Sequence, residues 1–408
     1  MPNTDPPPKH QERPPLATFT FFFLRMPEGI FNGFATILLP FLVTRAGLPA
    51  AAAASATAIA LLPYVMAALC GPIIDLSLTL RRWYCIALFG SAVMFILITA
   101  APIRRDTIGL LTAAAFCCEI GAVLICVTVA AIIARIVPDS AKGRAGGWYQ
   151  AGLLGGAGLG GGGGIWLTAH TSTSFTSFIL VGTAVASATA LRFLPALPVV
   201  RDGRSLQTRL VEVGRDLVEL VREPQGRLVT LLVVSPIGVG AATNLWSAIA
   251  IDWHTAPNLV ALVTGAVNGL AAAIGCIVGG RMADQIGRLN GFFGSGLMMA
   301  VVAVAMAAAP RNEAVFGSGV MLYSLSQGWA NAAYSALALY VISRGAVASK
   351  YAILTSLGNI PVSYMTAFDG YVHDRWSAAG MLTIEALIGV ACVAVALLPV
   401  RRLRLTHL

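Results

Sequence analysis

The sequence predicts an all-α membrane protein in which twelve transmembrane helices form two six-helix bundles. Of its 408 residues, 57% are hydrophobic and only 11% are charged, whereas about a quarter of a soluble globular chain is charged. So few charges could not cover a water-soluble surface. The apolar segments are continuous rather than alternating, which favours helices over a barrel. One long polar stretch near the middle of the chain divides these segments into six and six.

Apolar runs of roughly 20 residues suit a hydrocarbon core about 30 Å thick. In the first half such runs cover residues 17–43, 51–74, from 83 onward, 108–134, 148–169 and 178–197. In the second half they cover residues 228–251, 259–283, 291–309, 315–342, 351–372 and 379–400. The first run is too long for a signal peptide and is interrupted by Arg25 and Glu28, so we expect it to be retained as a span.

The central polar stretch, residues 197–227, interleaves arginines with acidic residues. Apolar residues recur every three or four positions from Leu206 to Leu220, which predicts an amphipathic helix. Such a helix lies along the membrane surface or against the cytoplasmic ends of other helices; a solvated linker helix is the alternative. The predicted division is a disordered cytoplasmic N-terminus (1–16), an N-terminal bundle (17–197), a cytoplasmic linker (198–227), a C-terminal bundle (228–400) and a basic cytoplasmic tail (401–408).

The net charge of +9 does not indicate nucleic-acid binding, because most of the 27 Lys and Arg residues fall in the termini and in the loops of one side. This asymmetry follows the positive-inside rule and predicts a multi-pass protein of the inner membrane with both termini in the cytoplasm. The seven cysteines lie in predicted spans without disulfide or metal-ligand spacing. We therefore expect no cofactor, no metal and no enzymatic activity, and we expect a monomer in the lipid bilayer.

Residues 152–164 are the most glycine-dense part of the chain and contain a G-x-G-x-x-G pattern at Gly156, Gly158 and Gly161. A dinucleotide site would need a preceding strand and a later acidic residue, and the surrounding sequence supplies neither. The glycines instead predict close packing of helix backbones, here of the fifth span against the other half.

A short pattern occurs at the same turn of each half. Gly71-Pro72-Ile73-Ile74-Asp75 follows the second span, and Gly280-Arg281-Met282-Ala283-Asp284-Gln285-Ile286-Gly287-Arg288 follows the eighth. Glycine permits a close approach of helix ends, and the aspartate can accept hydrogen bonds from the N-terminus of a neighbouring helix. Such contacts would hold one face of the protein closed. The candidate cytoplasmic gate comprises Gly71, Asp75, Gly280, Asp284, Gly287 and Arg288.

The segment from Gly280 to Arg288 resembles the signature loop of the major facilitator superfamily, and twelve spans with a central basic loop fit that superfamily along the whole chain. A narrower resemblance is to the muropeptide permease and the peptide and acetyl-coenzyme A transporter family. The residues that carry it are Pro27-Glu28-Gly29, Gly71-Pro72-x-x-Asp75, Ala336-Leu337-x-x-Tyr340 and residues 351–357. The resemblance implies the major facilitator fold and an alternating-access permease.

Charged residues within predicted spans are the first candidates for a site, because they usually face a cavity and have partners. Arg25 and Glu28 share a helix face; they could bind substrate or protons, or form a structural ion pair. Glu119 stands alone in the fourth span, where apolar surroundings favour a carboxyl that carries a proton. In the superfamily, spans one, four, seven and ten line the cavity. The resemblance therefore implies a substrate and proton site among Arg25, Glu28, Asn32, Glu119, Asn244, Trp246, Gln327, Trp329, Asn331 and Tyr334.

The absence of a nucleotide-binding motif suggests that an ion gradient supplies the energy, and isolated carboxylates favour protons as the coupling ion. We predict proton-coupled import of a small solute that is anionic, because Arg25 offers a planar fork, or peptide- or sugar-like. Proton-coupled export of small amphipathic compounds is the alternative, and a membrane scaffold or signalling protein on a transporter frame is the alternative of another class. Asp369 and Glu385, near the outer ends of the last two spans, are interpreted as an outer-gate pair or as solvated residues.

Overall fold

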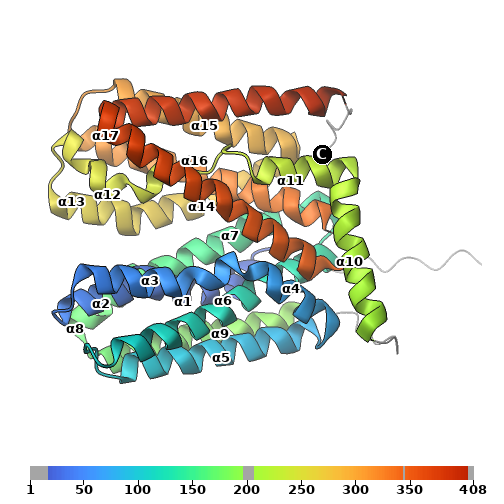
Figure 1. Ribbon diagram of the computed structural model, residues 1–408, viewed down its shortest axis with the longest axis horizontal. Coiled ribbons are helices and arrows are strands. Elements are labelled where there is room, and N and C mark those ends of the chain that lie inside the picture. The colour runs from blue at the N-terminus through green and yellow to red at the C-terminus, as the bar shows by residue number, and fades with distance from the viewer. Residues whose placement is uncertain (1–16, 196–205, 343–344, 403–408) are drawn as a thin grey trace, which may run out of the picture.

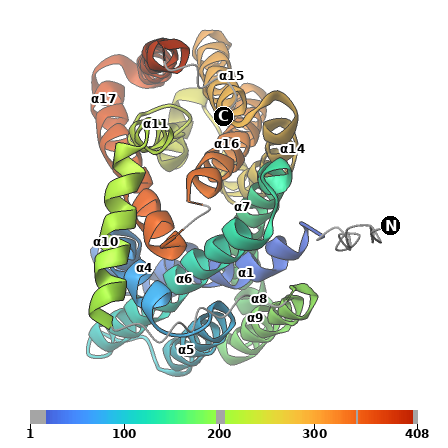
Figure 2. The same ribbon diagram turned by 90° about the vertical axis from the view of Figure 1, so that its right-hand side faces the viewer.

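The computed structural model describes residues 17–195, 206–342 and 345–402, and every regular element in these ranges is helical. Helices of the first half (α1–α9) and of the second half (α11–α17) form two groups that lie side by side, and α10 crosses one end of both (Figures 1 and 2). We call the end that carries α10 the linker end and the opposite end the far end. The predicted disordered N-terminus, the first part of the predicted linker (198–205) and residues 403–408 of the tail lie outside the described residues.

The first half contains one long helix after another. Its main helices are α1 (Thr20–Gly33), α2 (Leu39–Arg45), α3 (Ala50–Val65), α4 (Ala67–Leu76), α5 (Leu80–Ala100), α6 (Ile108–Ile136), α7 (Lys142–Gly158), α8 (Gly164–His170) and α9 (Thr173–Ser187). The π-helical turns η1 (Phe34–Leu38) and η3 (Leu159–Gly163) connect α1 to α2 and α7 to α8.

The second half begins with an interrupted segment. The elements from the linker onward are α10 (Leu206–Arg222), α11 (Pro224–Val233), η5 (Ala241–Asn244), α12 (Trp246–Ile249), η6 (Ala250–Trp253), α13 (Pro257–Leu262), η7 (Val263–Val267), α14 (Asn268–Ile286), α15 (Arg288–Ala308), α16 (Glu313–Val341) and α17 (Val347–Arg402). The backbone of α17 leaves the helical region at Trp376 and Ser377. It therefore turns there into two diverging arms: the C-terminal arm runs along the outer edge of the second half, and the first arm runs obliquely toward α4 of the first half (Figure 1).

Seven helices among the described residues are long and apolar enough to cross a membrane, or eight if the bent pair Ala52–Val65 and Ala67–Leu76 is one span. The predicted twelve is larger partly because α17 covers two predicted spans in one helix. In addition, the predicted spans 148–169 and 228–251 are divided into shorter pieces, and α16 is not among the seven. The number twelve therefore stays a prediction, while the all-helical membrane architecture is established.

The dense glycines of the fifth predicted span pack α7 tightly against α1. A Cβ at Gly152, Gly156 or Gly160 would collide with carbonyl oxygens of α1, so glycine is required for this approach. The expected close packing is thus present, but these glycines face their own half. Contact with the other half is made earlier in α7, where Gly143 and Gly147 lie against the backbone of α14.

The linker helix α10 covers the predicted amphipathic stretch and packs against α4, α11 and α17. Val213 and Leu220 on its apolar face are buried, whereas Leu210 remains exposed. Asp216 accepts a hydrogen bond of 2.7 Å from the backbone N–H of Ala346, just before α17. The helix therefore lies against the ends of other helices, which was one of the arrangements expected, and is not a free solvated linker.

Candidate functional site

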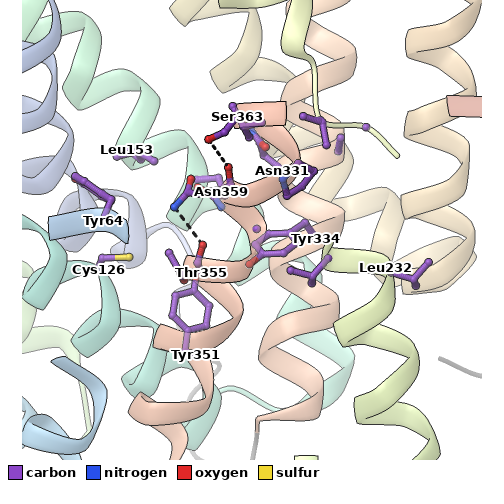
Figure 3. Close-up of a pocket in the computed structure, with 18 of the residues that line it drawn as sticks. Tyr64, Cys126, Leu153, Leu232, Asn331, Tyr334, Tyr351, Thr355, Asn359 and Ser363 are labelled. Carbon is purple, nitrogen blue, oxygen red and sulfur yellow. Dashed lines mark hydrogen bonds between the residues drawn. The ribbon is translucent and has the colours of Figure 1, made fainter. Parts of the chain in front are cut away.

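A cavity of about 490 Å³ lies between the two halves, a size typical of small-molecule sites. The first half contributes α1, α3, α6 and α7 to its wall, and the second half contributes α11, the segment that follows it, α15, α16 and α17. Figure 3 shows Tyr64 and Cys126 on one side and Tyr334, Tyr351 and Asn359 on the other. Because both halves supply side chains, a relative movement of the halves would change the shape of the cavity.

The charged wall of the cavity is formed by Arg25 and Glu28 of α1. Both side chains are buried, they form an ion pair, and Arg25 Nη2 donates a 3.0 Å hydrogen bond to Glu28 Oε1. The Arg25 guanidinium also lies 3.7 Å from the centre of the Tyr149 ring, a favourable cation–π contact. Arg25 Nη1 has no hydrogen-bond partner in this conformation. The arginine is thus held in place while one of its donors stays free.

Tyr64 of α3 connects this ion pair to Glu119 of α6. The Tyr64 hydroxyl donates a 3.4 Å hydrogen bond to Glu28 Oε1. Glu119 is buried, neither of its oxygens has a hydrogen-bond partner, and Glu28 and Tyr64 are the polar groups that act on it. A carboxyl buried without a partner is costly when ionised, so this arrangement favours a protonated Glu119 in the neighbourhood of Glu28 and Tyr64.

The second half lines the cavity with uncharged polar groups. On α17, Tyr351, Thr355, Asn359 and Ser363 follow one another at intervals of four residues (Figure 3). The Tyr334 hydroxyl of α16 donates a 3.0 Å hydrogen bond to a backbone carbonyl oxygen of α17. Sequence reasoning missed the α17 residues because it assigned the lining to other spans. The four-residue spacing of polar side chains in an apolar span was the signal that could have revealed them.

The predicted site residues do not all meet in this cavity. Those that line it are Arg25, Glu28, Asn32, Asn331 and Tyr334. The two tryptophans lie outside it, packed within the second half. Trp246 is buried edge-to-face against Tyr323 with 5.1 Å between ring centres, and Trp329 lies against Gly279.

The amides Asn244 and Gln327 also lie outside the cavity lining. Asn244 Nδ2 donates a 2.9 Å hydrogen bond to Thr366 Oγ1, and Gln327 Oε1 accepts one of 3.0 Å from Thr243. The expected position of Asn244 assumed a continuous seventh helix. The backbone instead breaks between α11 and η5, which removes the helix face on which the expectation rested.

At the linker end, Asp284 of α14 joins the two halves. Its carboxylate accepts hydrogen bonds from the backbone N–H groups of Gly143 at 2.7 Å and Arg144 at 3.0 Å, at the start of α7. Arg144 Nε adds an ion pair at 3.1 Å. A Cβ at Gly280 would collide with the Gly143 carbonyl oxygen, so the helices are in backbone contact here. This is the helix-terminus contact predicted for the aspartate of the pattern.

Asp75 of α4 makes the corresponding contact with the start of α17. It accepts hydrogen bonds from the backbone N–H groups of Ala348 at 3.3 Å and Ser349 at 2.8 Å, and from the Ser349 hydroxyl at 2.9 Å. Arg135 lies 3.5 Å from the same carboxylate. Gly71, one turn earlier, lets α4 approach the backbone at Ser349. Asp284 of the second half thus bonds to the start of a first-half helix, and Asp75 of the first half bonds to the start of a second-half helix. Both contacts join the halves at the same end of the molecule.

The remaining predicted gate residues, Gly287 and Arg288, form the turn between α14 and α15. Gly287 adopts φ +91°, which favours glycine. Arg288 donates to the carbonyl oxygen of Asp139 in the first half, and its guanidinium lies 4.3 Å from the centre of the Tyr340 ring. Burial lowers the pKa of nearby Lys142, whose ion pair with Asp139 at 2.9 Å acts in the opposite direction. Both basic side chains are thus fixed at the seam between the halves.

Comparison with known proteins agrees with this architecture. Residues 18–364 match the family described as Major Facilitator Superfamily. The crystal structure of the human organic anion transporter MFSD10 (TETRAN) is 16% identical, with 94% of this chain and 100% of that chain covered and a TM-score of 0.71. The structure of the E. coli fucose:proton symporter FucP is 17% identical, with 94% and 97% covered and a TM-score of 0.70. At these identities the likeness shows the fold alone. No curated protein matches the sequence.

Proposed function

The chain belongs to the major facilitator superfamily, and from that premise we propose that it is a proton-coupled secondary transporter that imports a small anionic or peptide- or sugar-like solute by alternating access. The observation that carries this proposal is Arg25 in the cavity wall with its Nη1 buried and unpaired, together with Glu28, the Tyr64 hydroxyl bonded to Glu28, and the buried Glu119 nearby. The narrower kinship to muropeptide and peptide permeases remains part of the proposal.

Substrate binding is coupled to proton binding because the substrate and Glu28 compete for the Arg25 guanidinium. Removing the partner of a buried charge leaves that charge uncompensated, which is strongly unfavourable. An anionic substrate that takes over the Arg25 guanidinium would therefore leave Glu28 with its charge buried and unpaired. Glu28 then accepts a proton, which Glu119 can supply through the Tyr64 hydroxyl. Substrate and proton thus bind together and are released together.

We assign the linker end to the cytoplasm of a cell with an inner membrane, with both chain termini on that side. The support is the concentration of basic residues in the loops of that end, as the positive-inside rule requires. The hydrogen bonds of Asp75 and Asp284 close this end in the described conformation. The conformation is then the outward-facing one, and both contacts must break before substrate can leave toward the cytoplasm.

The first test is a thermal-shift screen of the purified full-length protein against matched anionic and neutral solutes, because a ligand that binds the folded state raises the melting temperature. Arg25→Gln should abolish the shift produced by anionic binders. Arg311→Gln is the matched control, since Arg311 is also stacked on an aromatic ring, 4.2 Å from the centre of the Trp253 ring, but does not line the cavity. If only neutral or cationic lipophilic compounds stabilise the protein and Arg25→Gln changes nothing, the import proposal is refuted in favour of export.

The second test measures uptake into proteoliposomes for any solute found in the screen. An imposed proton gradient should drive accumulation, and Glu119→Gln should abolish accumulation while exchange of substrate across the membrane continues. Exchange needs no net proton movement, so its survival shows that the variant is folded and binds substrate. Accumulation that persists without a proton gradient but requires sodium would refute proton coupling. A variant Glu119→Gln that accumulates normally would remove Glu119 from the mechanism.

A further inference from the structure

The second half contains a second pair of carboxyls, the buried Asp369 and the half-buried Glu385, near the broken part of the chain between α11 and η5. The backbone there passes through Gly238 and Gly240, both at φ +68°, and Gln327 Nε2 donates a 3.4 Å hydrogen bond to the Val239 carbonyl oxygen. A small cavity of about 20 Å³ lies beside this break, with Glu385 in its wall. That volume holds about one water molecule. Interrupted spans beside buried carboxyls are typical places for coupling ions.

Asp369 and Glu385 lie on the two arms of α17, and their charges act on each other. Counted along the helix, Asp369 lies about 11 Å before Trp376, and Glu385 lies about 12 Å after Ser377, the second residue of the break. Asp369 has no exposed surface, which rules out the interpretation that it is solvated. Neither of its oxygens has a hydrogen-bond partner, and Glu385 Oε2 also lacks one.

The donors around this pair are unevenly distributed. The Tyr323 hydroxyl of α16 donates a 2.6 Å hydrogen bond to Glu385 Oε1. The backbone N–H groups of Ala241 and Ala242 also act on the Glu385 carboxylate. Of the described residues, no Lys or Arg acts on either carboxyl, and Asp369 receives no donor. Glu385 is therefore equipped to be ionised, and Asp369 is not.

A single proton bound by the two carboxyls would remove the repulsion between their charges. Two carboxylates that share a buried site cannot both ionise without a large penalty. A hydrogen on Asp369 would remove one of the two charges and could be donated to Glu385 Oε2, which is the acceptor left without a partner. We propose that Asp369 and Glu385 share one proton and form a second proton-binding site, enclosed within the C-terminal half and separate from the Arg25 wall of the central cavity.

The broken segment lies between the small cavity beside Glu385 and the central cavity, because Gly238 and Val239 line both. Protons could therefore reach the pair from the central cavity when this segment moves. Loss of the shared proton would set two negative charges against each other on the two arms of α17. The site thus couples the protonation of the C-terminal half to the packing of α17 against α16, independently of Glu28 and Glu119.

Other titratable groups near the pair must be separated from it in any test. Tyr323 of α16 is bonded to Glu385. His373 lies one turn after Asp369 on α17, and its Nε2 is 3.4 Å from Asp252 Oδ2 in η6. His373 is ionisable and lies on the same arm of α17 as Asp369, so its contribution must be separated from that of the carboxyl pair. His373→Gln is therefore the required control.

The test is an infrared spectrum of the purified full-length protein, recorded at several pH values. In the wild type we expect two buried protonated carboxyls, that of Glu119 in the first half and that of the Asp369–Glu385 pair, and Asp369→Asn should remove only the second. The asparagine has nearly the shape of the protonated acid and can donate to Glu385, so the variant should fold. Glu385→Gln, as a second variant, should lose the same signal because it supplies Asp369 with a donor. His373→Gln should retain the signal.

Stability provides an independent readout. A proton that is held in the folded state and released by the unfolded chain stabilises the protein at low pH, and this stabilisation is lost as pH rises. The melting temperature of Asp369→Asn should therefore rise relative to that of the wild type as pH increases. A carboxyl signal unchanged in both Asp369→Asn and Glu385→Gln would overturn the proposal. So would stabilisation of the wild type, but not of Asp369→Asn, by sodium chloride relative to choline chloride, because the occupant would then be sodium.

Discussion

Replacement of Asp284 by asparagine is the sharpest test of how the linker end is held closed. The substitution keeps the size and shape of the side chain and removes its charge. In the described conformation the carboxylate accepts backbone hydrogen bonds of 2.7 and 3.0 Å from the start of α7 and pairs with Arg144 at 3.1 Å. All three contacts join α14 to the other half, so they exist only while this end is closed.

The expected magnitude follows from these contacts. A hydrogen bond to a charged group contributes about 1.5–3 kcal/mol, and a carboxylate at a helix N-terminus about 0.3–1 kcal/mol. The amide oxygen of asparagine can still accept one neutral hydrogen bond, and the Arg144 pair is half exposed and contributes little. We therefore expect the closed state to lose about 2 kcal/mol, which lowers its ratio to the open state about 30-fold.

Cys276 is a native reporter of this change. It is fully buried on α14, and its carbonyl oxygen lies against Gly147 of α7. Eight residues, or about 12 Å of helix, separate it from Asp284. In a variant that retains only this one of the seven cysteines, the rate of maleimide labelling should report the open fraction. Asp284→Asn should raise that rate about 30-fold, provided that the closed state still dominates.

The matched control is a carboxylate that caps backbone at the opposite end. Glu313 Oε1 accepts a 2.7 Å hydrogen bond from the backbone N–H of Ala256, within the second half. Glu313→Gln should leave the labelling of Cys276 unchanged, because no contact between the halves is lost. Equal labelling rates in wild type and Asp284→Asn would refute the reasoning, and an equal increase in both variants would indicate general loosening instead of opening.

Further predictions concern stability and the linker. Glu28→Ala should lower the free energy of unfolding by about 3–5 kcal/mol, because Arg25 is left buried without its partner; Glu28→Gln should cost less, and thermal unfolding in detergent compares the two. Gly152→Ala should destabilise by about 1–3 kcal/mol through collision with a carbonyl oxygen of α1, whereas Gly158→Ala, which meets no atom, should be neutral in the same assay. Asp216→Asn removes a charge that accepts a backbone hydrogen bond beside α17, so it should increase labelling of the reporter cysteine about fivefold, for about 1 kcal/mol.

The contacts of the repeated pattern could be predicted because they depend on local chemistry. A glycine and an aspartate at the same turn of each half pointed to a helix N-terminus as the partner, and both aspartates accept hydrogen bonds from such a terminus. The partner helices, α7 for Asp284 and α17 for Asp75, could not be named from one sequence. That choice depends on how the two halves dock, which local spacing does not encode. The gating role of these residues remains a prediction.

The cavity lining was only partly predictable for a related reason. Arg25 and Glu28 were found because charges in an apolar span are costly and therefore conspicuous. Trp246 was expected in the cavity because the resemblance assigns the seventh span to its lining, but the chain breaks at Gly238 and Gly240 and Trp246 packs against Tyr323 instead. Gly238 and Gly240, two and four residues after Pro236, could have indicated that break.

The polar groups are divided unequally between the halves, and this division bears on how the transporter would work. The first half places Arg25 and Glu28 in the cavity wall, while α16 and α17 contribute hydroxyls and amides to it. The first half is therefore suited to bind charge, and the second to adapt around the uncharged part of a solute. Two breaks at which the backbone reaches positive φ, at Gly240 and at Ser377, also lie in the second half. Since broken backbone is where helices bend most easily, the second half should deform during the cycle while α1 and α7, locked by glycine contacts, move as one body. Hydrogen exchange of the purified protein should then be fastest, among the membrane segments, between α11 and η5 and near Ser377; faster exchange along α1 would contradict this division of roles.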